Sequence, residues 1–449
     1  MELGQFSSVE SAFHPVLASN YKPTSINGFL KILRGHFEGR TDWSLLRELL
    51  TKLGQPSVSP NSFERVAIQD RPFAESIAQL GRRSHAREDS PQFKVRKIGR
   101  ELDFLERTCF LPNLTPIQLV HLLLFRSIPP TKSVAVVVTM RDEGPSLLEW
   151  IAFNRAIGLA DIFVYSNDNV DGSDELLEVL ALAGVIKLIK NTIGPGTNPQ
   201  RKAYQHAVHM LRELRAYRWA LFLDADEFLT PDEQYDYRLD NLIAHVEETF
   251  QEDLPGAVVF PWEWRFNHLK LERTDGLLFE RYPHSTPHFQ VKSLTHLRTA
   301  LGMCEVHIPT LEPGARLVDS AFSPVDADFT WSVNLKSRAG GTISHFWGKS
   351  FEEFAVKKRR GELLSLGNDP YSREFKQYFE WTTNPTQENF HPAPEILLQR
   401  LHDSLSQLRT IPGVNAASDR IKAKYEELCR KIKAESNLRE IFDQMRLSV

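Results

Sequence analysis

Val134-Ala-Val-Val-Val-Thr-Met140 is an unbroken run of residues with strand preference, and five of the seven are valine or threonine. Such a run is typical of a strand covered on both faces, as in a parallel sheet between two layers of helices. Residues 146–157 follow as an amphipathic stretch that ends at Gly158 and predicts a helix. Strand and helix together form the first half of a βαβ unit.

This alternation continues along the chain. The predicted strands are 162–166, 185–189 and 219–224, and the predicted helices between them are 173–183 and 200–215. Strands separated by helices of this length indicate an α/β fold with a parallel, Rossmann-like sheet. Ligands of such sheets bind at the carboxyl ends of the strands, so we expect the functional residues there.

The fourth predicted strand ends in Asp224-Ala-Asp226-Glu227. Three carboxylates within four positions repel one another unless a cation lies between them. Mg²⁺ or Mn²⁺ suits this role, because it takes one or two carboxylates and completes its shell with phosphate oxygens and water. The motif therefore predicts a metal site for a phosphorylated ligand. The alternative is that both aspartates cap a helix that begins near Pro231-Asp232.

Polar residues also follow the first two strands. Thr139-Met-Arg-Asp-Glu-Gly144 leads into a helix, and helix N-termini attract anions. Asn167-Asp-Asn169 follows the second strand. An ordinary N-cap and an ordinary tight turn are the alternatives for these two segments.

Two cations, Arg201 and Lys202, open the helix predicted at 200–215. They oppose the helix dipole unless an anion is bound there, and solvation of both side chains is the alternative. Later in the chain, His345 and Lys349 are separated by an aromatic pair and a glycine. A lone histidine on a strand is more often a core residue, but one in this setting is a candidate metal ligand or phosphate contact.

The chain after Pro255 has a different texture. Short strands at 257–260, 288–292 and 342–346 lie between loops rich in Pro, His and Gly, which indicates an antiparallel or mixed extension of the sheet. Helices are predicted at 350–362 and within 395–445.

The front of the chain is read as helical and irregular by turns, with helices at 29–35 and 43–50. Pro129-Pro130 closes it as a linker. The predicted organisation is a helical N-terminal region of unknown role, a central domain and a helical C-terminal region, at residues 1–130, 131–365 and 366–449.

The composition limits the partners of the protein. Its 449 residues carry 54 basic and 58 acidic side chains, a net charge of −4, which argues against nucleic acid as a partner. Three widely spaced cysteines suit a reducing compartment. With neither a secretory signal nor an apolar run long enough to cross a bilayer, we expect a cytoplasmic protein without a transmembrane segment, and peripheral membrane association stays open.

Taken together, the motifs resemble those of family-2-like and family-92-like glycosyltransferases of the GT-A fold. The resemblance rests on Val138-Thr-Met-Arg-Asp-Glu-Gly-Pro-Ser-Leu-Leu-Glu-Trp150, Tyr165-Ser-Asn-Asp-Asn-Val-Asp-Gly-Ser173, Leu223-Asp-Ala-Asp-Glu-Phe-Leu229 and Ser344-His-Phe-Trp-Gly-Lys-Ser-Phe-Glu-Glu-Phe354. It covers about residues 133–362 in order. It implies a nucleotide-diphospho-sugar donor, a divalent metal and transfer to an acceptor hydroxyl of a glycan, polysaccharide or lipid-linked molecule.

The resemblance also implies residue roles. Asp224 and Asp226 are similar to the metal and diphosphate pair, and His345 to a late histidine that completes that site. The residues similar to those around the nucleoside are Thr139, Arg141, Glu143 and, beside the base, Asp168; Lys292 is a weaker match. The family commonly has Asn in place of Asp142 and Tyr in place of Phe346.

Such a reaction is a direct displacement at the anomeric carbon, and the family-2-like resemblance favours inversion. The metal, held by Asp226, and the cations Arg201, Lys202 and Lys349 would stabilise the leaving diphosphate. A carboxylate must act as base. Glu305 is the first candidate, because an apolar setting there would raise its pKa, and a structural role is its alternative. Asp326 and Asp328 follow as candidates, while Trp262, Trp264 and Phe266 are either sugar-stacking residues or core.

Three other classes of function compete with this interpretation. A nucleotidyltransferase would also use a metal-bearing α/β sheet, but the first strand is not followed by a Gly-rich, Lys-containing loop. A metal-dependent phosphatase of the haloacid-dehalogenase type usually has Thr or Val where this chain has Phe228. The non-enzymatic alternative is a carbohydrate-binding or scaffold protein.

Overall fold

The computed structural model describes residues 94–103, 105–108, 130–268, 270–311, 314–329, 331–358, 378, 389–436, 440 and 442–443. The helices predicted at 29–35 and 43–50 lie outside these residues, as does the end of the helix predicted at 350–362.

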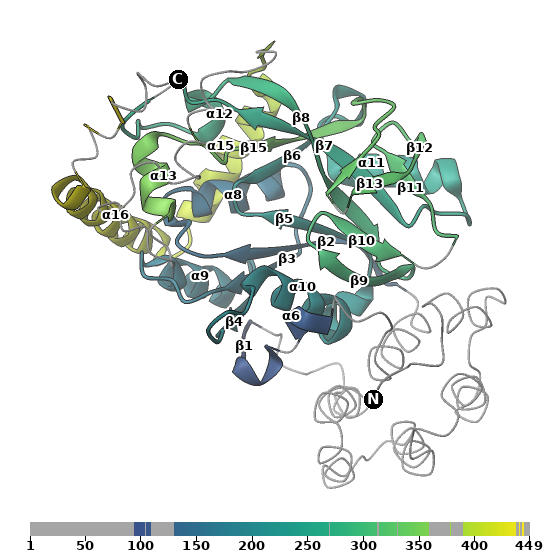
Figure 1. Ribbon diagram of the computed structural model, residues 1–449, viewed down its shortest axis with the longest axis horizontal. Coiled ribbons are helices and arrows are strands. Elements are labelled where there is room, and N and C mark those ends of the chain that lie inside the picture. Colours follow the sequence, from purple (N-terminus) through teal and green to yellow (C-terminus); the bar gives the residue numbers. More distant parts are fainter. Residues whose placement is uncertain are drawn as a thin grey trace, which may run out of the picture.

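The first half of the central sheet is parallel, as the sequence predicts (Figure 1). Its strands lie in the order β4, β3, β2, β5, and their bounds are β2 Lys132–Met140, β3 Ile162–Ser166, β4 Lys187–Asn191 and β5 Tyr217–Asp224. The helices between them are α8 Gly144–Ala156, α9 Ser173–Leu182 and α10 Pro199–His209. The mixed α/β class is thus confirmed. The third strand begins two residues later than predicted, and the helix predicted at 200–215 ends at His209, before a separate 3₁₀ turn, η3 (Arg212–Ala216).

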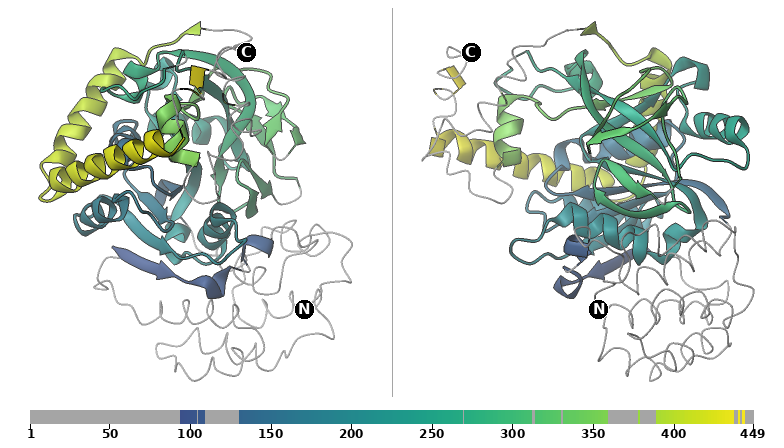
Figure 2. Two further views of the ribbon diagram at one scale, coloured as in Figure 1. Left: turned by 60° about the vertical axis from the view of Figure 1, so that its left-hand side comes forward. Right: turned by 45° about the vertical axis from the view of Figure 1, so that its right-hand side comes forward.

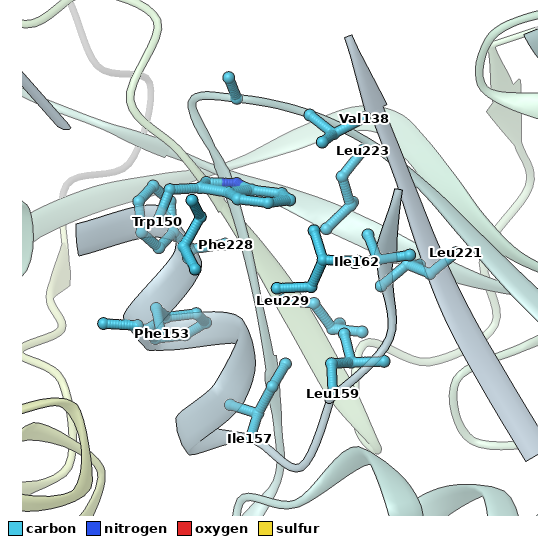
Figure 3. Packing of buried hydrophobic residues seen from close by; sticks show 14 of the residues in the cluster. Val138, Trp150, Phe153, Ile157, Leu159, Ile162, Leu221, Leu223, Phe228 and Leu229 are labelled. Carbon is cyan, nitrogen blue, oxygen red and sulfur yellow. The ribbon is translucent and has the colours of Figure 1, made fainter. Parts of the chain in front are cut away.

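The strand β2 is buried on both faces, which explains its unbroken apolar run. Val136 and Val138 lie in one core cluster, together with Trp150 and Phe153 of α8 (Figure 3). Ala135 and Val137 point to the opposite face and lie in a second cluster, which includes residues of α10. Successive strand residues point to opposite faces, so each cluster receives every second residue.

The second half of the sheet is mixed. The strand β8 (His284–His296) runs antiparallel between β5 and β7 (Ala257–Arg265). It is far longer than the predicted strand at 288–292, because Pro287 and the histidines at its two ends, His284 and His296, conceal its extent in the sequence. The strand β15 (Gly341–His345) pairs parallel to β7 and antiparallel to β6 (Glu227–Pro231).

The helix-cap interpretation of the aspartates is wrong. After Asp224 the chain makes a turn at residues 225–226 and returns as the strand β6, not as a helix. A 3₁₀ turn, η4 (Glu233–Tyr235), and α11 (Leu239–Phe250) come later. The shorter elements of the second half are α12 Leu278–Arg281, β9 Ala300–Glu305, β10 Ile308–Leu311, β11 Leu317–Asp319, β12 Pro324–Val325, β13 Ala327–Phe329, β14 Ser332–Val333 and β16 Asn389–Phe390.

Segments on either side of the predicted central domain pack against it. The strand β1 (Val95–Ile98) pairs parallel to β4 and so adds an edge strand to the sheet from the region predicted as helical; η2 (Arg100–Leu102) and α6 (Leu105–Thr108) follow it. At the other end, α15 (Glu395–Arg409) lies against α8, and α16 (Val414–Ser436) contacts α8, α9 and α13 (Phe351–Lys358). Figure 2 shows α15 and α16, in yellow, joined outside the sheet. Within the described ranges, every helix is too short or too polar to cross a membrane.

Gly340, just before β15, is a test of this packing. A Cβ atom there would lie 1.7 Å from the carbonyl oxygen of Ser320, and the residue has φ +96°. We expect Gly340→Ala to lower the free energy of unfolding by about 3 kcal/mol, since left-handed strain adds to a backbone clash. Gly314→Ala is the matched control, because φ is +84° with open space around it, and it should cost about 1 kcal/mol. Urea denaturation measures both, and equal losses would contradict the clash.

Candidate functional site

The candidate site lies where the direction of strand connection reverses. The chain leaves β2 for β3 on one side, whereas β5 pairs with β2 on the other. Thr139 of β2 and Asp224 of β5 are direct neighbours across this pair, at the carboxyl edge. In open α/β sheets this reversal leaves a crevice that binds ligands.

Asp224 is held by groups from two other elements. Gln200, at the start of α10, donates to Oδ1 of Asp224. Lys292 of β8 donates to Oδ2 at 3.2 Å. The Asp224 side chain is still 30% exposed, so it can reach a ligand at the edge of the sheet.

A buried lysine and a buried glutamate lie beneath Asp224. Lys292 and Glu227 are both fully buried, with Nζ 3.6 Å from Oε2, and Oε2 also accepts the backbone N–H of Asp224 at 2.9 Å. Burial raises the pKa of the Glu227 carboxyl well above its usual range, although Lys292 opposes this. Burial would lower the pKa of Lys292, but Asp224 and Glu227 raise it, so the lysine stays charged. Lys292, which resembles the family pattern only weakly, therefore lies at the centre of the site.

Asp226 is brought next to His345 by strand register. Glu227 of β6 lies opposite His345 of β15, and the N–H of Phe346 donates to the Asp226 carbonyl at 2.9 Å. Nε2 of His345 is 3.5 Å from Oδ1 of Asp226, and Lys357 of α13 contacts Oδ2. Burial would raise the pKa of Asp226, but Lys357 and His345 hold it well below its usual range. Asp226 is thus ionised although it is buried.

The loop after β2 is linked to the same lysine. Glu143 lies 3.8 Å from Nζ of Lys357 and 3.4 Å from Nζ of Lys349, which also donates to Ser146 at 3.1 Å. These side chains line a pocket together with residues of α16. Its other lining residues are Asp142, Pro145, Asp171, Trp347, Glu353, Phe354, Val356, Tyr425 and Leu428.

Asp142 ties the loops after β2 and β3 together. Its carboxylate accepts the N–H of Val170 at 2.6 Å and of Asp171 at 3.2 Å, while Asp171 accepts the N–H of Gly144 at 2.8 Å. The oxygen of an asparagine would accept the same bonds, so the departure from the family pattern at this position costs no contact of the loop. Asp168 lies exposed in the second of these loops, and Arg141 lies half-buried in the first.

The predicted metal ligands fit only in part. Asp226 and His345 offer a carboxylate oxygen and an imidazole nitrogen 3.5 Å apart, a donor set that suits Mn²⁺ or, less well, Mg²⁺. Asp224 instead faces Gln200 and Lys292. Among the described residues, His, Cys, Asp and Glu side chains form no group of three placed to hold a metal ion. The pair fits an ion that takes its remaining ligands from phosphate and water.

Lys202 and Arg201 do not face an open anion site. Lys202 is fully buried and donates to Asp103 at 2.8 Å and to the carbonyls of Gly99 and Thr192, so it fixes the segment before α6. The start of α10 is capped by Asn198, whose side chain accepts the N–H groups of Gln200 and Arg201. Protein contacts thus satisfy the helix start without an anion.

Glu305 is not in the apolar setting that the sequence suggests. Its side chain is 32% exposed, and Arg201 lies 3.4 Å from it. Asp326 is exposed, and the side chain of Asp328 lies outside the described residues. Trp262, Trp264 and Phe266 are buried, as the core interpretation expects.

Three contributors to the site were missed from the sequence: Gln200, Glu227 and Lys357. Gln200 and Lys357 are distant from the aspartates along the chain, and Glu227 was seen only as a third repelling charge. The pattern Gln200-Arg-Lys at the helix start was the one signal for Gln200.

The fold and the site define the class of protein. It is an α/β domain whose acidic and basic residues gather where the strand order reverses. The family model Glycosyltransferase family 92 matches residues 139–293. A glycosyltransferase family 92 protein of Oryza sativa subsp. japonica is 29% identical over 97 residues, and one of Ricinus communis is 28% identical over 95 residues. The matches cover 22% and 21% of this chain and 16% of each relative. Residues 139–293 are thus similar to the glycosyltransferase family 92 domain, and the matched part spans about a sixth of the length of these curated relatives.

The buried contact between Lys292 and Glu227 gives a stability prediction. Lys292→Met leaves the buried Glu227 and the partly exposed Asp224 without their cation, and we expect a loss of about 3 kcal/mol in the free energy of unfolding. The double variant Lys292→Met/Glu227→Gln should recover part of this, because one acid is removed. Arg316→Met breaks the exposed pair with Asp253 and serves as control, with a loss below about 1 kcal/mol. Equal losses in the two single variants would count against the buried pair.

Glu149 of α8 gives a pH prediction. Burial raises its pKa to about 7, while the N–H of Leu278 bonds to its Oε1 at 2.7 Å. The folded state therefore keeps a proton that the unfolded state loses, and stability falls as pH rises from about 4.5 to 7. Glu149→Gln keeps the acceptor and removes the titration. Its stability relative to the unaltered protein should rise by about 3 kcal/mol across that window in urea unfolding and stay level above it; a constant difference would contradict the prediction.

Proposed function

We propose that the domain transfers a sugar from a nucleotide-diphospho-sugar to the hydroxyl of a glycan, polysaccharide or lipid-linked acceptor, on a GT-A arrangement of the sheet. The observation that carries this proposal is the pairing of β6 with β15, which sets His345 beside Asp226 at the turn that follows β5. The family match supports the reaction class.

The donor would bind along the carboxyl edge of β2, β3 and β5. Thr139 is beside Asp224 in the sheet, and the exposed carboxylate of Asp168 is available to a nucleoside. Arg141 and Glu143 complete the first loop. This is where nucleotides bind in doubly wound sheets.

Asp226 and His345 would hold Mn²⁺ or Mg²⁺, with Asp224 at the adjoining end of the turn. Bound there, the ion would supply positive charge for the departing diphosphate. Lys349 and Lys357 lie around Glu143 and Asp226 and add two ammonium groups on the same side. Groups that are already oriented toward the developing charge lower the barrier without reorganisation.

The acceptor hydroxyl needs a base, and Glu305 stays the candidate. It lies at the end of β9, with Arg201 3.4 Å from its carboxylate. By analogy with the family, the displacement would invert the anomeric centre. If Glu305→Gln leaves the rate of sugar transfer unchanged, the base is a different residue.

A donor panel tests the proposal. Nucleotide sugars with Mn²⁺, Mg²⁺ or a chelator should give metal-dependent donor turnover, and Asp226→Asn should lower it at least about 100-fold. Asp253→Asn, at a surface carboxylate 84% exposed, is the matched control and should turn over normally. Melting temperatures check that both variants are folded.

Other substrates in the same assay separate the competing classes. Pyrophosphate release from nucleoside triphosphates would indicate a nucleotidyltransferase, and hydrolysis of p-nitrophenyl phosphate a phosphatase. Saccharide binding without turnover of any donor would indicate a carbohydrate-binding protein. If no donor responds to metal and Asp226→Asn equals the unaltered protein, the transferase proposal fails.

A further inference from the structure

The C-terminal helix α16 packs against the two loops that are proposed to bind the donor. Ile421 of α16 lies beside Gly144, the first residue of α8: a Cβ atom on this glycine would be 2.5 Å from Cγ2 of Ile421. Arg420 donates to Glu175 of α9 at 2.6 Å. The helix therefore lies against the segments that follow β2 and β3 (Figure 1).

The other end of α16 is attached to α13, the helix that carries Lys357. Nζ of Lys433 lies 2.9 Å from Oε1 of Glu352 on α13. Ile432 is buried in the same cluster as Phe354 of α13. The helix α16 thus connects the donor loops with the element that contacts Asp226.

The pocket described above lies between these elements. It contains about 440 Å³ of empty space, including the part that is open to solvent. Glu143 and Ser146 line it from the first donor loop and the start of α8, Lys357 lines it from α13, and Tyr425 lines it from α16. The pocket adjoins the metal site, because Lys357 contacts both Glu143 and Asp226.

Tyr425 brings a buried hydroxyl group to this pocket. Its side chain is 8% exposed, and no oxygen or nitrogen atom of the described residues forms a hydrogen bond with its hydroxyl. The sulfur of Cys429, a weak acceptor, lies beside it. Burial raises the pKa of Tyr425 well above its usual range, so the hydroxyl keeps its proton. A buried donor in this state indicates a ligand or water that accepts from it.

The acidic side chains that line the pocket already have partners in the protein. Asp142 and Asp171 accept backbone N–H groups. Glu353 lies 3.0 Å from the Arg281 guanidinium, and Glu143 lies between the ammonium groups of Lys349 and Lys357. These carboxylates are therefore used within the fold.

What remains for a ligand is mainly hydrogen-bond donors. An ammonium group has three N–H donors, and Lys349 uses two of them on Glu143 and Ser146. The hydroxyl of Tyr425 is a further donor. The start of α8 adds positive potential from the helix dipole. This combination suits a ligand that offers only acceptors and carries negative charge, as a phosphoryl group does.

We propose that Tyr425 is a donor-binding residue, whose hydroxyl donates a hydrogen bond to a phosphoryl oxygen of the nucleotide-diphospho-sugar. The inference rests on the transferase function. It adds to that function a residue from the C-terminal region, outside residues 139–293 that the family model matches. The helix α16 is then a part of the donor site as well as of the fold.

Binding of nucleoside diphosphates to the full chain tests this role. The probes are the diphosphates of uridine, guanosine, adenosine, cytidine and thymidine, with Mn²⁺, and inorganic pyrophosphate, all measured by calorimetry. Tyr425→Phe removes the hydroxyl but keeps the ring, whose centroid lies 5.8 Å from the Arg273 guanidinium. We expect the nucleotide that binds the unaltered protein to bind this variant about tenfold more weakly, or about 1.4 kcal/mol. The KM for the donor should rise by a similar factor, and the KM for the acceptor should not change.

Tyr235→Phe is the matched control. Tyr235 is also 8% exposed, but it lies in η4, where its ring contacts His245, and it is not among the residues that line the pocket. This variant should bind the nucleotide as the unaltered protein does. Melting temperatures check that both variants are folded.

The outcomes separate this inference from the transferase function. If Tyr425→Phe matches Tyr235→Phe in nucleotide affinity or in the KM for the donor, the role of Tyr425 is overturned and the transferase function stands. If no probe binds the unaltered protein and no donor is turned over, the transferase function fails, and this inference fails with it. If Tyr425→Phe loses only the binding of inorganic pyrophosphate, the pocket is an anion site separate from the donor, which also overturns the inference.

Discussion

The turn after β5 carries three carboxylates within four residues, and the elements around it are arranged by the charges and donors that balance them. Asp224 is met by Gln200 and Lys292, Asp226 by His345 and Lys357, and Glu227 by Lys292 and a backbone N–H. These partners come from α10, β8, β15 and α13. Uncompensated buried charge is costly, so all four elements contribute to the stability of the turn.

This constraint explains which parts of the fold the sequence predicts. The strands β2, β3 and β5 are buried on both faces and read as apolar runs, so composition alone places them. The strand β6 begins with Glu227 and ends with Pro231, and its strand character depends on pairing with β15 more than 100 residues later. Local strand preference does not depend on such distant pairing, so the sequence around the aspartates was also compatible with a helix cap.

The same reasoning applies to the site. Asp224 and Asp226 were predicted because they follow the fourth strand of a βαβ series, at the edge where ligands bind, and His345 because a lysine and aromatic residues lie beside it. Lys202 looked equally suited to an anion, but its partner Asp103 lies in a segment that the sequence alone does not bring near. A positive charge at a helix start is informative only when its distant partners are known. Lys357, one of several basic residues at the end of α13, was undistinguished for the converse reason: its contact with Asp226 spans 131 residues of chain.

His345 contacts both halves of the sheet. Its Nε2 faces Asp226 on the side of the parallel strands, and its ring lies against Trp262 on the side of the mixed extension. The backbone N–H of the next residue bonds to the Asp226 carbonyl, so the imidazole cannot move away from the turn without breaking the β6–β15 pairing. In the proposed transferase, a metal and donor held at the turn would therefore be positioned by the pairing of β6 with β15. Backbone register is more rigid than a loop, and precise placement of reactants is a large part of what an enzyme contributes to rate.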